Sequence, residues 1–522
     1  MWLHAEIQSL ADIPRFYGNS RKSETALTAG SRRRSFSALD VNSNRIANAM
    51  IESGCAPESR VTFIGKNSID YFEAMFATFK AQGIFVPLNW RLAAAELAQV
   101  LADAQPTLFL VDHEFSQLAR RAYDLAGCSC EMVEFDSTTE DASLNGNWAS
   151  HASTADPRLP VLQQSTAIIL YTSGTTGRPK GVQLSHRAFD YMRLSEHLDA
   201  GFEWRDDDMM LMVMPNFHLV GMGLSIQALY NGASLLILPA MDPEAVLHAI
   251  QRNRPSICCL VPTAIHVLLS HAHAEQTDFS SIRLVTYAGS RIESSLLKRA
   301  QAMMRCEFLQ FYGATETWTI TLLRPHQHDV TNEERMKSCG TPPPLVDLKV
   351  VDTNNCQVAD GTVGELLVRS PTLFSGYWNQ QEATKSALAD GWYRTGDAAY
   401  RSKDDGLYYL VDRVKDMIIS GGENIYSIEV EQALLKHPAV VMAAAIGCPD
   451  PMWGERVVGY VVLAPDCNPS KEDLLVFCRN ETAGYKVPKE LHIVDALPMT
   501  SIGKVMKRAL REQHIAASNA KA

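Results

Sequence analysis

The sequence predicts an α/β protein that continues into a β-rich segment and ends in a compact α+β unit. Short apolar runs alternate with amphipathic helical stretches through residues 1–330, which indicates parallel βαβ units. Residues 331–412 change to short strands between Gly and Asp turns, which favours a small β-barrel. Helices and strands then mix in residues 416–522. Three parts of different character therefore follow one another along the chain.

The first 165 residues show the alternation clearly. A strand is expected at Val61–Ile64, and a helix is expected to open at Asn67. The apolar residues of this helix recur at helical spacing: Ile69, Phe72, Phe76 and Phe79. The polar segment 138–157 predicts a long loop, which would mark a boundary between two subdomains.

Length and charge limit the classes of function. A chain of 522 residues has multi-domain length, and its formal net charge of −11 argues against nucleic acid as a main partner. No apolar run approaches the length of a membrane span. The start, Met1–Ile7, lacks a basic stretch followed by an apolar core, so no signal peptide is predicted. We therefore expect a cytoplasmic protein without a transmembrane segment.

Cysteines and histidines give no metal-binding pattern. The eleven cysteines lack ordinary metal-ligand spacing and are predicted to be reduced thiols. The pairs His271/His273 and His326/His328 have no further ligands nearby in the sequence, so surface histidines are favoured over a metal site.

Residues 171–182, Tyr-Thr-Ser-Gly-Thr-Thr-Gly-Arg-Pro-Lys-Gly-Val, carry the strongest chemical signal. They follow the apolar strand Ala167–Leu170 and precede a helix with Ser185 as its N-cap, so a strand–loop–helix turn is predicted. Glycines let the backbone approach an anion, and successive N–H groups can form an anion-binding nest. Hydroxyl donors and the charge of Lys180 suit a polyphosphate. The residues expected to bind it are Thr172, Ser173, Gly174, Thr175, Thr176, Gly177 and Lys180.

This loop does not have the Walker pattern, because Gly177 is followed by Arg-Pro-Lys-Gly. A kinase or GTPase P-loop therefore loses most of its support. An ordinary Gly/Ser/Thr surface loop remains the alternative.

A second segment, Leu309–Trp318, combines several nucleotide-binding groups. Tyr312 could place its ring on a purine, and Thr315 offers a hydroxyl to a phosphate. Glu316 offers a hard oxygen to Mg²⁺, which accompanies ATP phosphates. The segment is short, and by itself it leaves an ordinary turn open.

A third segment, Gly391–Asp397, ends in a carboxylate beside a glycine turn. Asp397 could accept hydrogen bonds from both hydroxyls of a ribose. The alternative is an aspartate that only stabilises the turn.

In this order along the chain, the three motifs resemble the signatures of the adenylate-forming superfamily. This superfamily includes acyl-CoA synthetases, firefly luciferase-like ligases and the adenylation domains of peptide synthetases. Two later stretches complete the resemblance: Asp412–Ile425 is similar to the hinge segment, and Pro498–Lys507 is similar to the closing P-x-T-x-x-G-K signature. The resemblance therefore covers nearly the whole chain.

The resemblance implies an α/β fold in two parts. Residues 1–413 would form a large N-terminal domain of two αβ-layered subdomains plus a small β-barrel, which binds ATP and the acyl substrate. Residues 414–522 would form a small mobile α+β C-terminal domain that carries the catalytic lysine.

The resemblance also implies a reaction in two halves. A carboxylate attacks the α-phosphate of Mg·ATP to give an acyl-adenylate and pyrophosphate, and a thiol then releases AMP. Lys504 would relieve the repulsion between the two anions, and Thr315 and Glu316 would complete the catalytic set, with Glu316 holding Mg²⁺. The further residues implied to bind ATP are Tyr312, Asp397 and Arg413.

After adenylation, the small domain of such enzymes rotates, and Lys415 falls at the position of the pivot. Gly421 and Gly422 would then lie near the channel for the pantetheine arm of CoA.

The segment around His218 bears on the identity of the acid. Amino-acid-activating relatives carry an aspartate near this position, but Asn216-Phe-His218-Leu contains no carboxylate, so amino acids are disfavoured. Residues of the expected acyl pocket are His218, Gly289 and Trp318, with Leu219, Val220, Met222, Tyr287 and Ala288 around them. Arg291 departs from the usual Gly-Gly-Ala-Pro pattern of the family, and each of these residues could also belong to the core.

The leading hypothesis is an AMP-forming acyl-CoA synthetase for a hydrophobic acid, fatty first and aryl next, with CoA as acceptor. A ligase that loads a carrier-protein pantetheine, a luciferase-like oxygenase and a non-catalytic nucleotide-binding regulator stay open. Retention of both Glu316 and Lys504 argues against the regulator, since binding alone needs neither. A homodimer also stays open.

Overall fold

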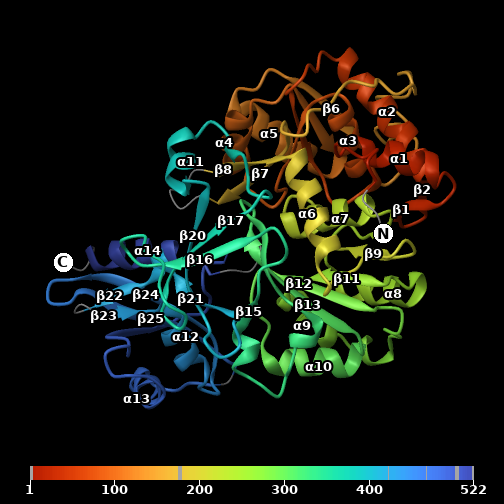
Figure 1. Cartoon of the computed structure of the whole chain (residues 1–522). Coiled ribbons are helices and arrows are strands. Elements are labelled where there is room, and N and C mark those ends of the chain that lie inside the picture. The colour runs from red at the N-terminus through yellow and green to blue at the C-terminus, as the bar shows by residue number, and fades with distance from the viewer. Residues whose placement is uncertain (1–3, 174–178, 421–422, 466, 500–504, 520–522) are drawn as a thin grey trace. The chain divides into compact units, whose positions relative to one another are not determined.

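The computed structural model describes residues 4–173, 179–420, 423–465, 467–499 and 505–519 (Figure 1). The chain divides into two compact units. The first comprises Met1–Leu348 with Val368–Tyr393, and the second comprises Lys349–Leu367 with Arg394–Ala522. A functional boundary after Arg413 stays a prediction.

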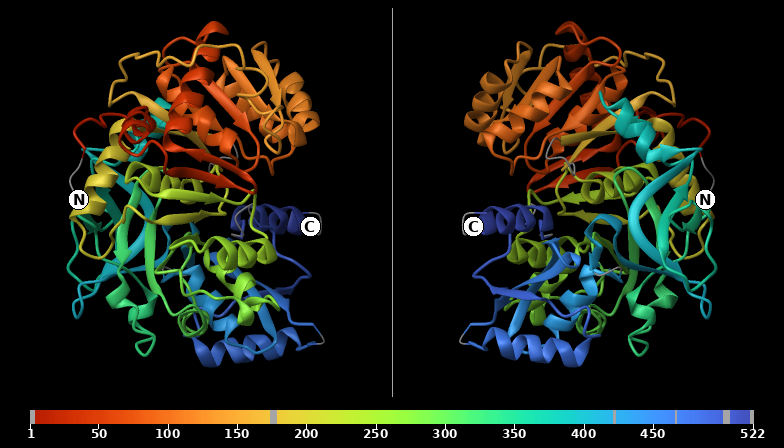
Figure 2. Two further views of the ribbon diagram at one scale, coloured as in Figure 1. Left: turned by 90° about the vertical axis from the view of Figure 1, so that its right-hand side faces the viewer. Right: turned by 90° about the vertical axis from the view of Figure 1, so that its left-hand side faces the viewer.

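The first unit contains a sheet that we call the β7 sheet, mostly parallel, with helices packed along its faces (Figure 2). Its strands pair in the order β18 (Gly376–Tyr377), β8 (Pro179–Ser185), β7 (Thr166–Ser173), β4 (Ile84–Pro87), β3 (Arg60–Ile64), β5 (Leu108–Asp112) and β6 (Glu131–Phe135). Strands β7, β4, β3, β5 and β6 run parallel, whereas β8 is antiparallel to both of its neighbours.

A second sheet of this unit, the β13 sheet, contains the next set of βαβ units. Its strands pair in the order β14 (Trp318–Leu323), β13 (Glu307–Ala314), β12 (Leu284–Ala288), β11 (Ile257–Leu260), β9 (Met209–Met212), β10 (Ser234–Ile237), β1 (Thr25–Ala29) and β2 (Arg32–Ser35). The two strands at the ends of this order, β14 and β2, are antiparallel to their neighbours.

The helices of this unit have the following bounds: α1 (Asp12–Ser20), α2 (Phe36–Glu52), α3 (Ile69–Lys80), α4 (Ala94–Ala104), α5 (Ser116–Ala126), α6 (His186–Leu198), α7 (Leu219–Tyr230), α8 (Pro243–Asn253), α9 (Pro262–Ser270), α10 (Ser294–Met304) and α11 (Gln381–Ala387). Two short strands complete it, β15 (Ser338–Gly340) and β19 (Leu388–Ala389).

Helix α3 is buried along its whole length, including its charged residues. An apolar helix surrounded by protein is stable, but each buried charge needs a partner. Asp70 accepts from Arg32 at 2.8 Å, and Glu73 accepts from Arg34 at 2.8 Å. In loop 138–157, Leu144 N donates to the Asp70 carboxylate at 2.9 Å, and the Asn145 side-chain amide donates to the Glu73 carboxylate at 2.7 Å. The predicted loop therefore supplies hydrogen-bond donors to the buried carboxylates of α3.

The second unit begins with a sheet in which β21 (Tyr408–Arg413), β20 (Trp392–Arg401), β17 (Gly364–Arg369) and β16 (Asp347–Val351) pair in that order. It is the segment for which a small barrel was expected. Residues 358–361 form turns and loop there.

The end of the second unit is the predicted α+β unit. Its sheet has the order β23 (Glu423–Ile425), β22 (Ile418–Ser420), β25 (Gly454–Leu463) and β24 (Val440–Asp450), and β26 (Glu490–Ile493) also pairs with β25. Its helices are α12 (Ser427–Leu435), α13 (Lys471–Glu481) and α14 (Lys507–Asn519). Separate apolar clusters lie on the two faces of the sheet, with Leu434 and Leu474 in one and Leu510 in the other.

Two local predictions needed correction. The loop after Ser173 leads into β8 rather than directly into a helix, so the expected strand–loop–helix turn is a β-hairpin followed by α6. Ser185 is the N-cap of α6, as predicted, and accepts from Ala188 N at 3.2 Å. Helix α3 is capped by Ser68 instead of Asn67, because the Ser68 hydroxyl accepts from Tyr71 N.

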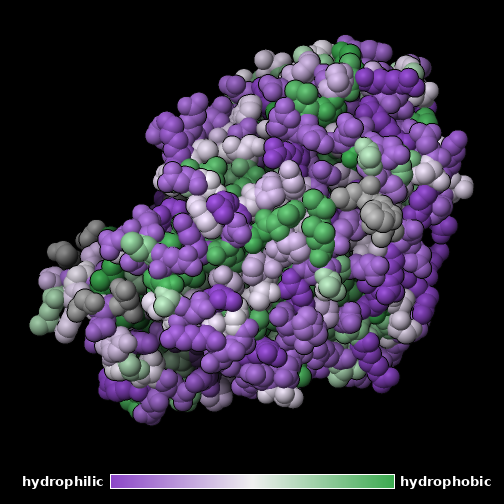
Figure 3. Space-filling model, viewed as in Figure 1, coloured by the Kyte–Doolittle hydropathy of each residue, from purple (hydrophilic) through white to green (hydrophobic). Residues whose placement is uncertain are grey.

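Each helix of the described residues is too short or too polar to pass through a bilayer. All eleven cysteines lie in the described ranges and are free thiols, as predicted. Hydrophilic residues cover most of the face shown in Figure 3, with hydrophobic residues scattered among them.

The buried position of α3 gives a test of the fold. We expect Phe72→Ala to lower the free energy of unfolding by about 3–5 kcal/mol, because it leaves a cavity among fully buried side chains. Leu125 on α5 is 59% exposed, and Leu125→Ala should change stability by less than about 1 kcal/mol. Urea unfolding followed by tryptophan fluorescence measures both variants. Equal losses would contradict the central burial of α3.

Candidate active site

Six of the predicted site residues of the first unit lie where the strands of the β13 sheet end. Strands β9, β11, β12 and β13 run parallel, so their carboxyl ends lie at one edge. Ligands of open α/β sheets bind outside this edge. The predicted residues that lie at it or just after it are His218, Gly289, Tyr312, Thr315, Glu316 and Trp318.

The expected phosphate loop begins on β7 and ends on β8, two strands that pair antiparallel. Thr172 and Lys180 are cross-strand partners at its base. The Thr172 hydroxyl lies 3.5 Å from the Lys180 carbonyl oxygen. Ser173 ends β7, and its side chain is not described. Gly174, Thr175, Thr176 and Gly177 lie outside the described residues.

The turn that carries Thr315 and Glu316 is held by residues 372–378, which we call the 372–378 segment. Within the turn, the Thr317 hydroxyl accepts from Ala314 N at 2.9 Å. Phe374 N donates to the Glu316 carbonyl at 2.8 Å, and the Thr372 hydroxyl donates to the Thr317 carbonyl at 3.3 Å. The backbone at Glu316 is therefore fixed from outside its own sheet.

Tyr377 contacts both Glu316 and Lys180, which are far apart in the sequence. Its hydroxyl donates to Glu316 Oε1 at 2.8 Å, and the Lys180 Nζ lies 4.7 Å from the centre of its ring. Burial, followed by the charge of Glu316, raises the Tyr377 pKa well above its ordinary value, so the phenol stays neutral and donates. Strand β18 places it by pairing Tyr377 with Val182 of β8.

Sequence reasoning did not identify Tyr377. The available signal was Gly376-Tyr377-Trp378. An aromatic pair after a glycine does not by itself indicate a functional site. The role of Tyr377 follows from a strand pairing between distant parts of the chain.

The environment of Glu316 fits the implied magnesium ion. Carboxylate oxygens are hard ligands, and Mg²⁺ is commonly held by one or two of them together with substrate phosphates. Glu316 is half-buried, and Tyr377 fixes one of its oxygens. The nearby Lys180 charge suits phosphate oxygens, so the donor set matches an ion that is shared with a nucleotide.

Trp318 lies deep beside the expected acyl pocket. Its side chain is 4% exposed, and its ring meets Phe189 of α6 edge-on, with centroids 4.6 Å apart. Its backbone has a φ of 59°, which is unusual for a bulky residue. Gly223 of α7 lies so close that an added Cβ would stand 3.1 Å from the indole ring. The glycine therefore allows α7 to approach the tryptophan.

His218 and Gly289, two residues of the expected acyl pocket, each follow a strand of the β13 sheet. His218 is the N-cap residue immediately before α7, and its ring lies 4.6 Å from that of Phe217. Gly289 follows β12 with a φ of 87°, a left-handed conformation that favours glycine. Both lie at the edge of the sheet that carries Glu316.

Tyr287, which was expected near the pocket, is part of the buried core. Its hydroxyl lies 3.0 Å from His328 Nε2 and 3.2 Å from Gln310 Oε1. His328 was expected on the surface, but it is buried, and burial lowers its pKa to about 4. His326, two residues earlier, is exposed, so the H-x-H spacing by itself does not show which of the two histidines is buried.

In the second unit, two predicted nucleotide-binding residues contact each other. Asp397 of β20 and Arg413 of β21 are cross-strand partners, and Arg413 Nε lies 2.7 Å from Asp397 Oδ1. The Thr395 hydroxyl accepts from Asp397 N at 3.0 Å and donates to the Leu366 carbonyl at 2.7 Å. The carboxylate is thus held within β20 rather than at the expected turn, next to Gly396, which has a φ of 70°.

The remaining predicted residues are described in part or not at all. Lys415 lies in a short 3₁₀ helix, Val414–Asp416, and its side chain is not described. Lys504, Gly421 and Gly422 lie outside the described residues, so their roles stay predictions.

Comparisons with known proteins agree along the whole chain. Residues 17–378 match the family model of the AMP-binding enzyme, and residues 429–504 match that of the AMP-binding enzyme C-terminal domain. The fatty acid–[acyl-carrier-protein] ligase ScoC of Streptomyces coeruleorubidus is 34% identical over 514 residues, which are 98% of this chain and 97% of that protein. The feruloyl-CoA synthase of an Amycolatopsis species is 33% identical and covers 94% of this chain and 96% of its own length.

Solved structures show the same fold. The ATP-bound MatB from Rhodopseudomonas palustris matches with a TM-score of 0.86 at 28% identity, over 97% of this chain and 99% of that one.

The contacts of Tyr377 give a test of the site. Tyr377→Phe keeps the ring beside Lys180 but removes the hydroxyl from Glu316. We expect ATP-dependent pyrophosphate exchange to fall about tenfold or more, since a hydrogen bond to a charged group contributes ~1.5–3 kcal/mol.

A matched control is Tyr123→Phe, which removes a hydroxyl that donates to the Cys130 carbonyl within the first unit. Its exchange rate should equal that of the unaltered protein. If Tyr377→Phe were equally active, Tyr377 would have no part in positioning Glu316.

Proposed function

The chain belongs to the AMP-binding enzyme family of adenylate-forming acid–thiol ligases, and we propose that it joins a hydrophobic carboxylic acid to the thiol of CoA. The acid would first react with ATP to give an acyl-adenylate and pyrophosphate. The thiol would then replace AMP. A fatty acid is the preferred substrate class, with an aryl acid next.

Tyr377 supports the first half-reaction most directly. It contacts both Lys180, beside the expected phosphate loop, and Glu316, the expected magnesium ligand. When bound, Mg²⁺ would neutralise phosphate charge. The chain itself would hold the phosphate tail with the hydroxyls and Lys180 of the hairpin and would keep Glu316 in one orientation through Tyr377. Thr315 would offer its hydroxyl to a phosphate oxygen.

Asp397 and Arg413 would act on the sugar. A carboxylate that accepts both ribose hydroxyls binds the nucleoside without contacting the base. Arg413 keeps Asp397 in place through their contact at 2.7 Å and could add a charge toward the phosphates. Tyr312 would stack on the purine.

The residues near His218 and Trp318 support an apolar acid. Residues 212–223 contain no Asp or Glu, so the segment offers no partner to a substrate ammonium group. Trp318 packs against Phe189 and lies close to Gly223, so the surroundings of this segment are aromatic and closely packed. Apolar walls with few polar groups are typical of sites for hydrocarbon or aryl groups.

CoA is the proposed acceptor, and a carrier-protein pantetheine is the second candidate. The names of two similar proteins refer to these two acceptors, a carrier protein for ScoC and CoA for the feruloyl-CoA synthase. Both acceptors present the same thiol arm, so the chemistry at the acyl carbonyl is identical. Kinetics with each acceptor must decide.

Pyrophosphate release across a panel of fatty, aryl and amino acids tests the function. We expect release with ATP and Mg²⁺ to require an apolar acid and to become sustained when CoA is added. A burst that CoA does not relieve, but that a pantetheinylated carrier protein does, would replace CoA by the carrier. Absence of release with every acid would favour a non-catalytic nucleotide-binding regulator.

Substitutions at two lysines would distinguish the two half-reactions. Lys504→Ala should abolish adenylation but leave thioester formation from supplied acyl-adenylate nearly intact, because the lysine would act only between the carboxylate and the α-phosphate. Lys415→Pro should have the opposite effect, since a fixed φ would hinder rotation about the hinge. Single-turnover assays of each half measure both variants.

Equal loss of both half-reactions in Lys504→Ala would refute the role of this lysine. Normal CoA-dependent turnover in Lys415→Pro would refute the hinge.

A further inference from the structure

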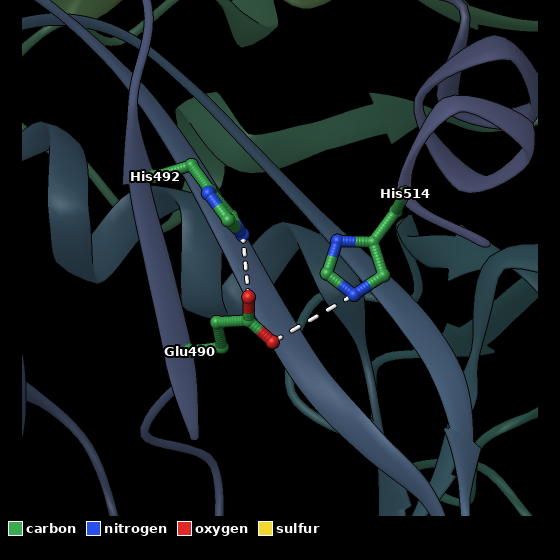
Figure 4. Close-up of side chains that lie close together, drawn as sticks. All are labelled: Glu490, His492 and His514. Carbon is green, nitrogen blue, oxygen red and sulfur yellow. Dashed lines mark ion pairs between the residues drawn. The ribbon is translucent and has the colours of Figure 1, made fainter. Parts of the chain in front are cut away.

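A cluster of metal-ligating side chains lies in the second unit, on residues to which no role has been assigned above. Glu490 and His492 belong to β26, and His514 belongs to α14 (Figure 4). Residues i and i+2 of a strand lie on the same face, so Glu490 and His492 both face the helix that carries His514. One strand and one helix therefore bring three donor groups together.

The donor atoms of this cluster converge. His492 Nε2 lies 2.8 Å from Glu490 Oε1, and His514 Nε2 lies 3.7 Å from Glu490 Oε2. One donor atom from each residue lies within 4.8 Å of the other two. A cation that binds donors at about 2.0–2.2 Å holds them up to about 4.4 Å apart, so the separations of 2.8 and 3.7 Å allow a shared ion.

Tyr460 of β25 orients both imidazoles. Its ring stacks on His492, with centroids 4.8 Å apart and planes inclined by 20°. Its hydroxyl lies 2.9 Å from His514 Nδ1. A metal-bound histidine commonly donates its other ring N–H to an oxygen, and the Tyr460 hydroxyl is placed to accept it. This arrangement directs His514 Nε2 toward Glu490.

The buried Nε2 of His492 has no hydrogen-bond partner among the described residues, although Glu490 Oε1 is close to it. Where Nε2 carries no proton, this nitrogen and the Glu490 oxygen 2.8 Å away are both electron-pair donors, and a cation bound to both would satisfy them. We propose that Glu490, His492 and His514 form a binding site for a divalent transition-metal ion of the Zn²⁺ class. The ion would bind Nε2 of both histidines and one oxygen of Glu490.

The donor set selects this class of ion. Imidazole nitrogen suits Zn²⁺ and other late first-row ions, whereas Mg²⁺ and Ca²⁺ prefer oxygen alone. Two histidines and one glutamate are a known set for zinc, and such a set leaves a fourth position for water. The site is therefore distinct in chemistry from the magnesium proposed at Glu316.

Arg456 is the competitor of the ion. Its Nη2 lies 3.3 Å from Glu490 Oε2 and 3.5 Å from His514 Nε2. Its positive charge opposes a cation at this place, so the guanidinium must move when the ion binds. Removal of this charge should strengthen binding.

The ion would join the C-terminal helix to the sheet. Helix α14 begins three residues after Lys504 and already packs on the sheet through Leu510. A bond from His514 to β26 through the ion would hold the helix at a second point. Binding to the folded state alone raises stability.

The test uses full-length, tag-free protein that a chelator has stripped of metal. Zn²⁺ is titrated in competition with a chromophoric chelator, and one equivalent should bind. His492→Asn and His514→Asn should each weaken binding by at least about tenfold, since even supporting residues of a metal site contribute 10–100-fold. Arg456→Gln should bind more tightly than the unaltered protein. Zn²⁺ should raise the melting temperature of the unaltered protein but not of the histidine variants.

His326→Asn is the matched control, because His326 is an exposed histidine of the first unit. It should bind as the unaltered protein does. The exposed thiols Cys356 and Cys467 are competing ligands, so Co²⁺ serves as a spectroscopic probe. A thiolate charge-transfer band, binding that survives in both histidine variants, or absence of Zn²⁺ binding would each overturn the proposal. Circular dichroism verifies that each variant is folded.

Discussion

The candidate site depends on the hydrogen bonds between the 372–378 segment and the turn after β13. Phe374 N fixes the Glu316 carbonyl, and Tyr377 fixes the Glu316 carboxylate, so backbone and side chain are held by the same segment. A carboxylate that must meet a metal and a phosphate loses rate if it has to reorient first. Because β18 is also a strand of the β7 sheet, the hairpin with Lys180 and the turn with Glu316 are positioned together.

Tyr377 contacts two opposite charges while it stays neutral. Its ring attracts the Lys180 ammonium, and its hydroxyl donates to the Glu316 carboxylate. Direct pairing of Lys180 with Glu316 would neutralise both groups and reduce their attraction for nucleotide and metal. Separation by a neutral phenol keeps each charge available while limiting its movement.

The sequence predicted those features that local patterns determine. Ser185 precedes a helix and caps it, as predicted, because capping acts within a few residues. Tyr377 was not predictable, since its position comes from a pairing with Val182. The helix α6 was predicted correctly, but the expectation that the phosphate loop leads directly into it was wrong, because residues 179–185 form the second strand of the hairpin. His328 shows that spacing alone does not report burial.

The hydrogen bonds to the buried carboxylates of α3 determine where the chain can be divided into fragments that fold. Loop 138–157 was expected to separate two subdomains, yet its Leu144 and Asn145 satisfy carboxylates inside the preceding one. A fragment that ends before this loop would leave Asp70 and Glu73 without these donors in an apolar interior. Polypeptide emerging from the ribosome would face the same deficit until the loop has been made. The first 137 residues are therefore not an autonomous folding module, and the sequence boundary there is not a physical one.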